Sequence, residues 1–358
     1  MKTRTFVAAT VACAAVVGTS AATASAAVTL NGGGATFSQP LWQQTGANLK
    51  KKLTLNYQGI GSGAGVTQFT NGTLDFAGTD PPLTDKQVGS VQAKGGPVVH
   101  VPVALGAITV SYNIPGIKSG LRLDGAAIAN IYLGKINNWN DGAIKKLNPK
   151  AKLPNLPISV FRRSDSSGTT AGFTLFLSKY SSEWVSKAGA PGNTAKWPVG
   201  TGASGNAGVA AGGKQRKGAI GYVEQAYAVQ NKFTYATVKN RKKEWIAPNL
   251  KSVTKAGSGL KVASSIRFTA IDSATSGAYP IVSQTFMINH RNVCAQKGVD
   301  AAKASAIFGV IDYLYGAAGT KMLNKLVYAQ IPADLKRKVK KQLASSNCNG
   351  KKIKAAKY

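Results

Sequence analysis

Short apolar runs rich in β-branched residues alternate with segments of helical spacing along most of the 358-residue chain. The runs have the length and composition of strands, and helical segments bring apolar side chains to one face. This alternation predicts an α/β fold, and the length suggests two domains. The predicted strands are Leu53–Gly59, Val98–Leu105, Ala107–Asn113, Ile158–Arg162 and Gly218–Val223. The predicted helices are Gln39–Lys51, Gly65–Gly72, Ala126–Leu133, Gly172–Ser178 and Ala301–Tyr315.

Two basic stretches have weaker patterns. Residues 187–217 are rich in Gly, Ala, Lys and Asn, which predicts surface loops with one short helix. Near the C-terminus, Pro332 opens a predicted helix with Leu335, Val339 and Leu343 on one face and Lys and Arg on the others. Either the basic side chains of this helix are simply solvated while its narrow apolar stripe packs against the protein, or they form a surface that binds polyanions.

Acidic residues are scarce. The chain has 45 Lys and Arg against 13 Asp and Glu, a formal net charge of +32, and 44% hydrophobic residues. The apolar content supports a sizeable core and excludes a disordered polycation. So few carboxylates leave little material for a metal centre or an acid/base pair. The balance instead suggests an anionic partner, either a polyanion or a small anion.

The N-terminus predicts secretion. Two basic residues precede an apolar stretch from Phe6 to Gly18, and Ala24–Ala26 fits a small-residue cleavage site. Residues 1–26 are therefore predicted to be a signal peptide, and the mature protein extracytoplasmic: secreted, periplasmic or associated with the cell wall. Cys13 is interpreted as part of the discarded signal, with lipid modification as the alternative.

Few cysteines and histidines remain after that cleavage. Cys294 and Cys348 form an even pair in an oxidising compartment, which favours a disulfide over zinc ligation by two lone cysteines. His100 and His290 lie in or beside apolar strand-like runs, which favours structural roles. No metal site is expected.

Two glycine-rich segments precede predicted helices. They are Gly32–Ser38 and Gly59–Gly65. Glycine lets the backbone approach a ligand closely, and a helix N-terminus favours an anion. Neither segment fits a Walker A motif or a dinucleotide fingerprint. Ordinary turns are the alternative explanation for each.

A third segment, RRSDSSGTT, follows a predicted strand and leads into an apolar helix. The Arg163 guanidinium can grip two oxygens of a tetrahedral anion, and Asp165 is placed to orient it. Ser167, Gly168 and Thr169 offer hydroxyl and N–H groups at a helix start. An N-cap explains a Ser or an Asp there, but not the whole combination.

A fourth segment, DFAGTDPP, places Asp80 before two prolines. A carboxylate near an anion is unfavourable unless the ligand carries a proton that the carboxylate accepts. A fully ionised anion such as sulfate would leave two acceptors facing each other. The alternative is a turn-forming acid.

Four motifs occur together in chain order: Gly34–Phe37, Tyr57–Gly63, Asp75–Asp80 and Arg163–Thr169, and two further stretches, Ile131–Ile136 and Gly218–Glu224, accompany them. With them the chain resembles the PstS-type phosphate-binding proteins of ABC transporters, over about Leu30 to Pro332. The opening Asn31–Gly34 is also similar to the DING phosphate-binding proteins.

The resemblance implies a two-lobe periplasmic-binding-protein type II fold with two crossover hinge strands. Residues 27–104 and 281–358 would form lobe I, and residues 105–280 lobe II. The implied function is capture of inorganic phosphate in the cleft between the lobes and its delivery to an ABC importer, without catalysis or a cofactor. The implied phosphate-binding residues are Thr36, Phe37, Ser62, Asp80, Arg163, Ser167, Gly168 and Thr169, with Asp165 supporting Arg163.

Two other functions compete with this interpretation. A phosphatase or phosphotransferase could use the same residues, but it would need a metal cluster or an activated nucleophile. A secreted polyanion binder could act through charge alone. We expect a monomer with no specific nucleic-acid partner. Most of the positive charge is then a long-range field that concentrates anions or holds the protein near anionic cell-wall polymers.

Overall fold

The structure is a computed structural model that describes residues 27–260 and 262–358. The predicted signal peptide, residues 1–26, and Cys13 within it lie outside the described residues. The largest sheet contains β1 (Val28–Gly34), β2 (Leu53–Gly59), β3 (Phe76–Thr79), β4 (Val98–Asn113), β6 (Ser159–Arg163), β7 (Thr201–Ala203), β8 (Ala219–Glu224), β9 (Thr234–Tyr235) and β12 (Val282–His290). Two small sheets contain β5 (Arg122–Leu123), β10 (Thr237–Lys239) and β11 (Trp245–Ile246), and β13 (Asn347–Cys348) and β14 (Lys351–Lys352).

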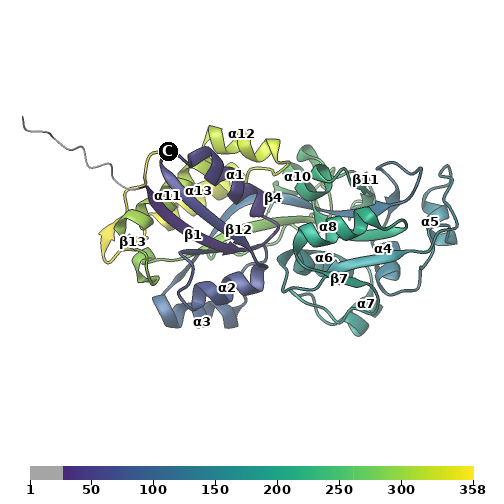
Figure 1. Cartoon of the computed structure of the whole chain (residues 1–358), viewed down its shortest axis with the longest axis horizontal. Coiled ribbons are helices and arrows are strands. Elements are labelled where there is room, and N and C mark those ends of the chain that lie inside the picture. The colour runs from purple at the N-terminus through teal and green to yellow at the C-terminus, as the bar shows by residue number, and fades with distance from the viewer. Residues whose placement is uncertain (1–26, 261) are drawn as a thin grey trace, which may run out of the picture.

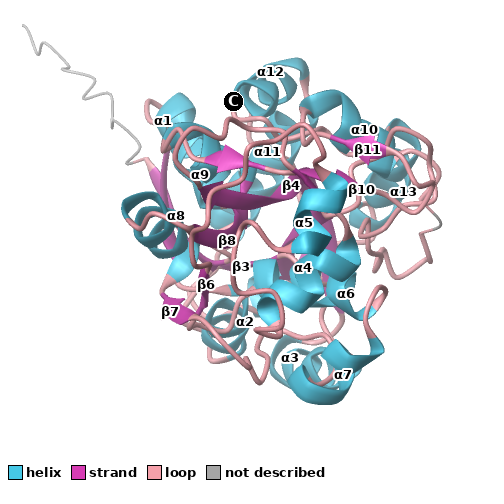
Figure 2. Ribbon diagram, turned by 90° about the vertical axis from the view of Figure 1, so that its right-hand side faces the viewer, coloured by secondary structure: helices cyan, strands magenta, loops and turns pink. Residues whose placement is uncertain are grey.

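Helices surround these strands (Figure 2). They are α1 (Gln39–Leu49), α2 (Ser62–Thr70), α3 (Asp85–Gly95), α4 (Gly125–Tyr132), α5 (Gly142–Leu147), α6 (Gly168–Ser178), α7 (Ser182–Ala188), α8 (Gly205–Gln215), α9 (Gln225–Gln230), α10 (Leu250–Gly257), the 3-10 helix η1 (Val293–Ala295), α11 (Ala301–Tyr315), α12 (Ala317–Lys325) and α13 (Ala333–Leu343). In the described part of the chain, none is long and apolar enough to cross a membrane.

The elements form two α/β lobes (Figure 1). One lobe contains β1, β12 and helices α1 to α3 and α11 to α13, and the other contains β7 and helices α4 to α8. The strand order is β2-β1-β3-β12-β4-β8-β6-β7, with β9 beside β4. The predicted α/β two-lobe architecture is therefore confirmed.

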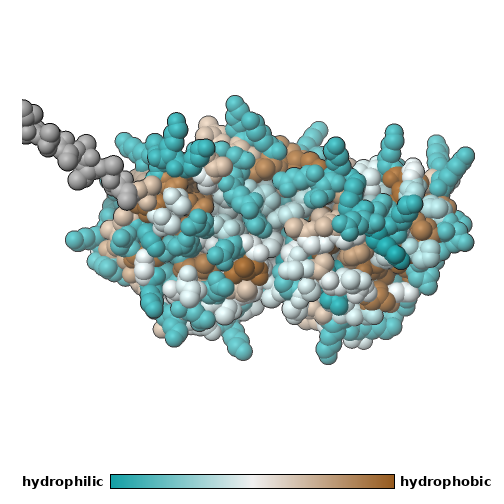
Figure 3. All heavy atoms as spheres, viewed as in Figure 1, coloured by the Kyte–Doolittle hydropathy of each residue, from teal (hydrophilic) through white to brown (hydrophobic). Residues whose placement is uncertain are grey.

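Hydrophilic side chains project from both lobes on the face in Figure 3 rather than gathering on one of them.

Strand β4 passes from one lobe to the other. Its first part pairs antiparallel with β12 as far as Ala107, and from Ile108 onward it pairs with β8. The returning chain runs beside it, because the Ile108 N–H donates to the Ile281 carbonyl at 2.8 Å. The two crossings thus lie together, just beyond the lobe boundary expected after residue 104.

The prediction of two strands across residues 98–113 is wrong, because β4 is one strand of 16 residues. Gly106, which separates the two predicted strands, stays extended and lies beneath two aromatic rings. A Cβ there would lie 2.7 Å from Phe37 Cζ and 3.0 Å from Tyr328 Cδ1. Glycine at this position makes room for the rings and does not end the strand.

Glycines at residues 32–34 also belong to a strand, β1, between β2 and β3. A Cβ on Gly32 would lie 2.2 Å from Phe76 Cζ, and one on Gly34 would lie 2.1 Å from the Gly78 carbonyl oxygen. Gly34 has a φ of +135°, which L side chains rarely adopt. These glycines let the chain turn directly into α1 after a buried strand.

The expectation of surface loops with one short helix in residues 187–217 is only partly right. The segment contains β7 and the 11-residue helix α8, with Asn206, Val209 and Ala210 buried. The many glycines of α8 hid its helical pattern. Gly212 and Gly213 allow close packing, since Cβ atoms there would lie 2.6 Å and 2.7 Å from the rings of Phe161 and Phe233.

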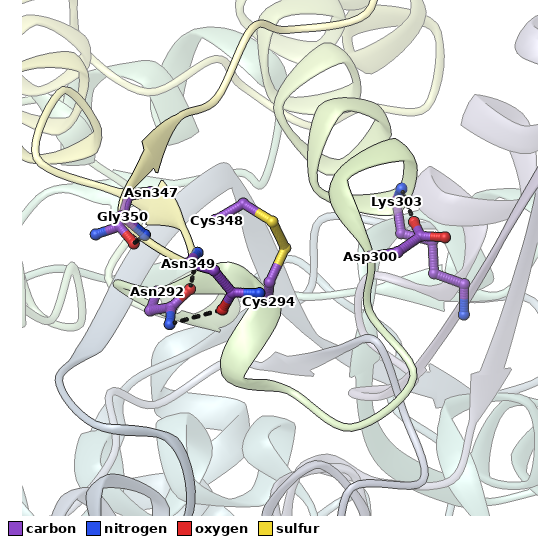
Figure 4. The surroundings of a disulfide bond; sticks show 8 residues. All are labelled: Asn292, Cys294, Asp300, Lys303, Asn347, Cys348, Asn349 and Gly350. Atoms are coloured by element: carbon purple, nitrogen blue, oxygen red, sulfur yellow. Dashed lines mark hydrogen bonds between the residues drawn. A yellow bond between two sulfur atoms is a disulfide. The ribbon is translucent and has the colours of Figure 1, made fainter.

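The C-terminal helix and the cysteine pair complete the first lobe. Leu335, Val339 and Leu343 of α13 are buried, as the apolar stripe predicts. A disulfide joins Cys294 in η1 to Cys348 in β13, so it ties the segment after α13 to the end of β12 (Figure 4).

Replacing both Cys294 and Cys348 by Ala should lower the free energy of unfolding by about 2–4 kcal/mol, because the bond closes a loop with a sequence separation of 54 residues. Urea unfolding of the mature protein measures this loss. The unaltered protein treated with a reductant is the control and should match the variant. Identical unfolding midpoints with and without the bond would contradict the prediction.

Candidate anion-binding site

The site residues predicted from the sequence all lie at or after the carboxyl ends of strands. Thr36 and Phe37 follow β1, Ser62 follows β2, and Asp80 follows β3. Arg163 is the last residue of β6 in the other lobe, and the residues up to Thr169 come directly after it. Carboxyl ends of parallel strands are where α/β sheets place ligands, and here those of the two lobes face each other.

Three helices begin at this meeting point. They are α1, α2 and α6, of 11, 9 and 11 residues. Their first N–H groups have no partners within their helices, and their dipoles favour negative charge. The three helix N-termini therefore favour an anion at this point independently of the formal charges of the side chains.

Arg163 is the cation of the site and is 3% exposed. Its Nε donates to Asp165 Oδ1 at 2.7 Å, its Nη2 donates to Asp165 Oδ2, and its Nη1 donates to Thr169 Oγ1 at 3.4 Å. Its backbone N–H donates to the Tyr222 hydroxyl at 3.1 Å, and the Tyr222 ring stacks on Phe173 at 4.3 Å. The guanidinium thus has a fixed orientation.

Asp165 is held ionised by the same contacts. Its partial burial acts to raise the pKa of the carboxyl, but the Arg163 guanidinium and the Gly205 N–H, which donates to Oδ1 at 3.1 Å, outweigh it. The pKa of Asp165 therefore lies below its usual value. Asp165 contacts Arg163 as the sequence analysis expected of its supporting role.

Asp80 has the opposite environment. It is 1% exposed, and neither carboxylate oxygen has a hydrogen-bond partner among residues 27–260 and 262–358. Its backbone is fixed, because the Gln284 amide donates to the Asp80 carbonyl at 2.7 Å. Burial raises the pKa of the Asp80 carboxyl to about 7, although the nearby Thr285 hydroxyl and the charge of Arg163 act to lower it.

Gly168 brings the start of α6 against Asp80 and Ser62. A Cβ on Gly168 would lie 2.4 Å from Asp80 Oδ2 and 2.5 Å from Ser62 Oγ. The Ser62 hydroxyl also accepts a bond from the Asp80 N–H at 3.4 Å. Asp80 and Ser62 of one lobe therefore lie against the first residue of α6 in the other, and only glycine fits between them.

Ser167 has a role of its own in the helix. Its Oγ accepts the Thr170 N–H at 3.1 Å and so caps the N-terminus of α6. A serine hydroxyl keeps its own proton in such a cap and can still donate it. The ordinary N-cap that the sequence analysis weighed is present, beside the Arg163 and Asp165 pair.

Sequence reasoning missed residues that link the two lobes at the site. Asn206 Nδ2 donates to Thr36 Oγ1 at 2.9 Å and to Thr169 Oγ1 at 3.1 Å. The Tyr227 hydroxyl donates to the Thr36 carbonyl at 2.7 Å. The Ser204-Gly205-Asn206 run at the start of α8 could have identified Asn206 as a site residue. Like Ser167-Gly168-Thr169, it places a hydroxyl, a glycine and a further polar side chain at the start of a helix.

The lobes also meet through their backbones. The Gly63 N–H of α2 donates to the Ser166 carbonyl at 3.1 Å. Beside this contact lies a cavity of 800 Å³, lined on one side by Thr79 and Gln284 and on the other by Ser166 and Gly168. The site is closed at the contact and flanked by this cavity.

The histidines make their contacts away from these groups. His100 Nε2 accepts the Leu83 N–H at 3.1 Å, and burial lowers the pKa of His100 to about 4. His290 stacks on Phe69 at 5.1 Å. Within residues 27–260 and 262–358, no group of three or more His, Cys, Asp and Glu side chains could hold a metal ion.

Together, the Arg163 cation, the Asp80 carboxylate and the three helix N-termini suit recognition of a small tetrahedral anion that carries a proton.

Comparisons with known proteins identify the family of this chain. A model of the PBP superfamily domain matches residues 19–316. The phosphate-binding protein PstS of Xylella fastidiosa is 38% identical over 323 residues, which cover 89% of this chain and 85% of the relative. PstS of Pasteurella multocida is 35% identical and covers 88% and 90% of the two chains.

A solved structure shows the same fold. It is the periplasmic phosphate-binding protein PfluDING bound with phosphate, with a TM-score of 0.71 and 23% identity, covering 87% of this chain and 93% of that one. The architecture expected from the resemblance is thus confirmed at the level of the fold. From the sequence matches, the chain belongs to the PstS phosphate-binding proteins of the PBP superfamily.

Proposed function

We propose that the mature protein captures inorganic phosphate between its lobes and delivers it to an ABC phosphate importer. The observation that carries this proposal is the Asp80 carboxylate, which is buried, lacks a hydrogen-bond partner among the described residues and faces the start of α6. A buried acceptor without a donor is costly, and a ligand that brings a proton removes the cost. Monohydrogen phosphate is such a ligand.

The other groups supply donors for the remaining phosphate oxygens. Arg163 provides the ion pair, oriented by Asp165. Donors come from the N–H groups of Phe37 and Gly168 and from the hydroxyl and backbone N–H groups of Thr36, Ser62, Ser167 and Thr169. One cationic side chain, Arg163, together with several uncharged hydrogen-bond donors can bind a dehydrated anion, so the site needs no second positively charged side chain.

Capture without catalysis fits these residues better than ester hydrolysis. Ser62 and Ser167 contact the Asp80 N–H and the Thr170 N–H, and neither bond makes the hydroxyl more nucleophilic. The relatives are named as phosphate-binding proteins. We propose a monomeric, extracytoplasmic solute-binding protein with residues 27–104 and 281–358 in one lobe and residues 105–280 in the other.

Titration calorimetry with phosphate and with sulfate, each at low and high salt, tests the function. We expect phosphate binding that persists at high salt and no binding of sulfate. Loss of all binding at moderate salt would favour a polyanion binder acting through charge alone. Turnover of a chromogenic phosphate ester would favour an enzyme.

Replacing Asp80 by Asn tests the proton-accepting role. The amide keeps the shape of the side chain but can donate a hydrogen bond, so it should tolerate sulfate and lower the ratio of phosphate to sulfate affinity by about tenfold or more. Calorimetry with both anions measures the ratio. An unchanged ratio in this variant would eliminate the role given to Asp80.

The stability of the ligand-free protein should depend on pH through the same group. The folded state raises the pKa of Asp80 to about 7 from an ordinary value of about 3.9, so the folded state binds more protons than the unfolded chain between these values. The stabilisation by the proton is full below about pH 4 and is lost as the pH rises through about 7. In phosphate-free buffer, Asp80 should therefore contribute a fall of about 2 kcal/mol in the free energy of unfolding from about pH 5 to about pH 8, in addition to the fall from the buried Glu224, whose pKa burial raises to about 8. Asp80→Asn should reduce this slope, and equal slopes would refute the assignment.

Asn206→Ala should weaken phosphate binding by about tenfold, because it leaves Thr36 and Thr169 without the amide that fixes both hydroxyls. Asn138→Ala is the matched control: Asn206 accepts the Glu224 N–H, and Asn138 likewise accepts backbone N–H groups in the second lobe but lies away from the site. We expect the control to keep its phosphate affinity in calorimetry. Equal affinities of the two variants would contradict the role of Asn206.

A further inference from the structure

A second basic cavity lies outside the anion-binding site, where residues 262–267, which belong to the proposed second lobe, meet β4, β12 and α13 of the first. It has a volume of 840 Å³ and lies between the start of β4, the end of β12, residues 262–267 and α13. Its charged lining consists of Arg267, Arg291, Lys338 and Lys341. These four cations come from three separate parts of the chain, so the fold and not a local run of lysines assembles them.

Most of this positive charge is not neutralised by the protein. Arg267 pairs with the exposed Asp85 at 2.6 Å. Among the residues that the structure describes, the other three cations have no carboxylate within 4.0 Å, and the Lys338 ammonium instead donates to the Val262 carbonyl at 3.4 Å. The cavity thus keeps a net positive charge that a bound anion would offset.

Uncharged polar groups line the same cavity. Ser264 and Ser345 contribute hydroxyls, and Gln342 contributes an amide. The Gln342 Oε1 is buried and has no hydrogen-bond partner in the described ranges. An amide without a fixed partner can turn its NH₂ group toward an anion. The cavity therefore offers hydrogen-bond donors as well as charge.

Helix α13 divides its cations between different surroundings. Lys338 and Lys341 are three residues apart, hence on one face of the helix, and both line the cavity. Lys336 instead lies over the Tyr315 ring, with its ammonium 5.6 Å from the ring centroid, and donates to the Tyr315 carbonyl. Arg337 and Lys340 are exposed, as Lys338 and Lys341 are, but they do not line the cavity. Of the five cations of this helix, only Lys338 and Lys341 therefore line a cavity that could bind a polyanion.

We propose that this cavity binds a short linear chain of phosphate groups, either inorganic polyphosphate or a phosphodiester polymer. A single phosphate ion is only a few times the size of a water molecule, whose share of liquid volume is about 30 Å³, so one ion would leave most of the cavity unfilled. Cations distributed along the cavity match charges repeated along a chain. Lysine and arginine are the usual partners of such phosphates.

The two anion sites can be tested separately. Arg267 also lines the 800 Å³ cavity beside the phosphate site, so it is left unchanged in the variants. Inorganic phosphate at a saturating concentration occupies the proposed phosphate site and leaves the second cavity for longer chains. Failure of phosphate binding and failure of chain binding are then distinct results.

The experiment measures the affinity of the mature protein for tripolyphosphate and for poly(glycerol phosphate) in saturating phosphate at physiological salt. The test variant is the double change Lys338→Gln and Lys341→Gln. The matched control is Arg337→Gln and Lys340→Gln, which removes the same charge from the same helix outside the cavity. Phosphate affinity measured alone verifies that both variants are folded.

We expect the test variant to bind at least one of the two chains about tenfold more weakly and the control within about twofold of the unaltered protein. Tripolyphosphate as the better ligand would identify inorganic polyphosphate as the source, and poly(glycerol phosphate) would identify a phosphodiester polymer. Equal weakening by both variants would show a diffuse charge effect and overturn the site. Absence of binding of both chains to the unaltered protein would overturn it as well.

Discussion

Burial of the Asp80 carboxylate is the constraint around which the site is arranged. An unpaired buried carboxylate is expensive, and the nearby Thr285 hydroxyl and Arg163 charge reduce that cost only in part, so the pKa of Asp80 stays raised to about 7. Arg163 cannot relax toward Asp80, because Asp165 and Thr169 fix its guanidinium. The fold therefore holds an acceptor and a cation apart at fixed positions, which is a preorganised arrangement for an anion that brings a proton.

The same arrangement explains how the fold can serve capture and release. β4 and the returning chain at Ile281 cross between the lobes side by side, while the contacts at the site join Gly63 to Ser166 and Thr36 to Asn206. These contacts at the site involve residues proposed to bind phosphate or their neighbours. Bound phosphate would add contacts from both lobes, so its affinity shifts the population toward the closed state. This coupling is what delivery to a permease requires.

The sequence was informative wherever chemistry is local. The RRSDSSGTT run predicted the contact between Arg163 and Asp165, because both residues lie within one turn after a strand, and scarce acids made Asp80 conspicuous. The α/β class followed from the alternation of patterns. Asn206 was missed because glycines conceal the periodicity of α8 and because its partners are 170 and 37 residues away in sequence. The break predicted at Gly106 was wrong for a related reason. Glycine is needed there to make room for the Phe37 and Tyr328 rings, which come from distant segments of the chain. The basic cavity likewise depends on tertiary structure, which brings Arg291 to the lysines of α13.

The central claim is that phosphate binds with a protonated oxygen against Asp80 and with its charge against Arg163. A crystal structure of the mature protein grown with phosphate tests this most directly. The account predicts one phosphate between the lobes, with one oxygen within hydrogen-bond distance of an Asp80 carboxylate oxygen and others at Arg163 and at the N-terminus of α6. Phosphate bound only at surface lysines, or bound between the lobes with its oxygens turned away from Asp80, would contradict it.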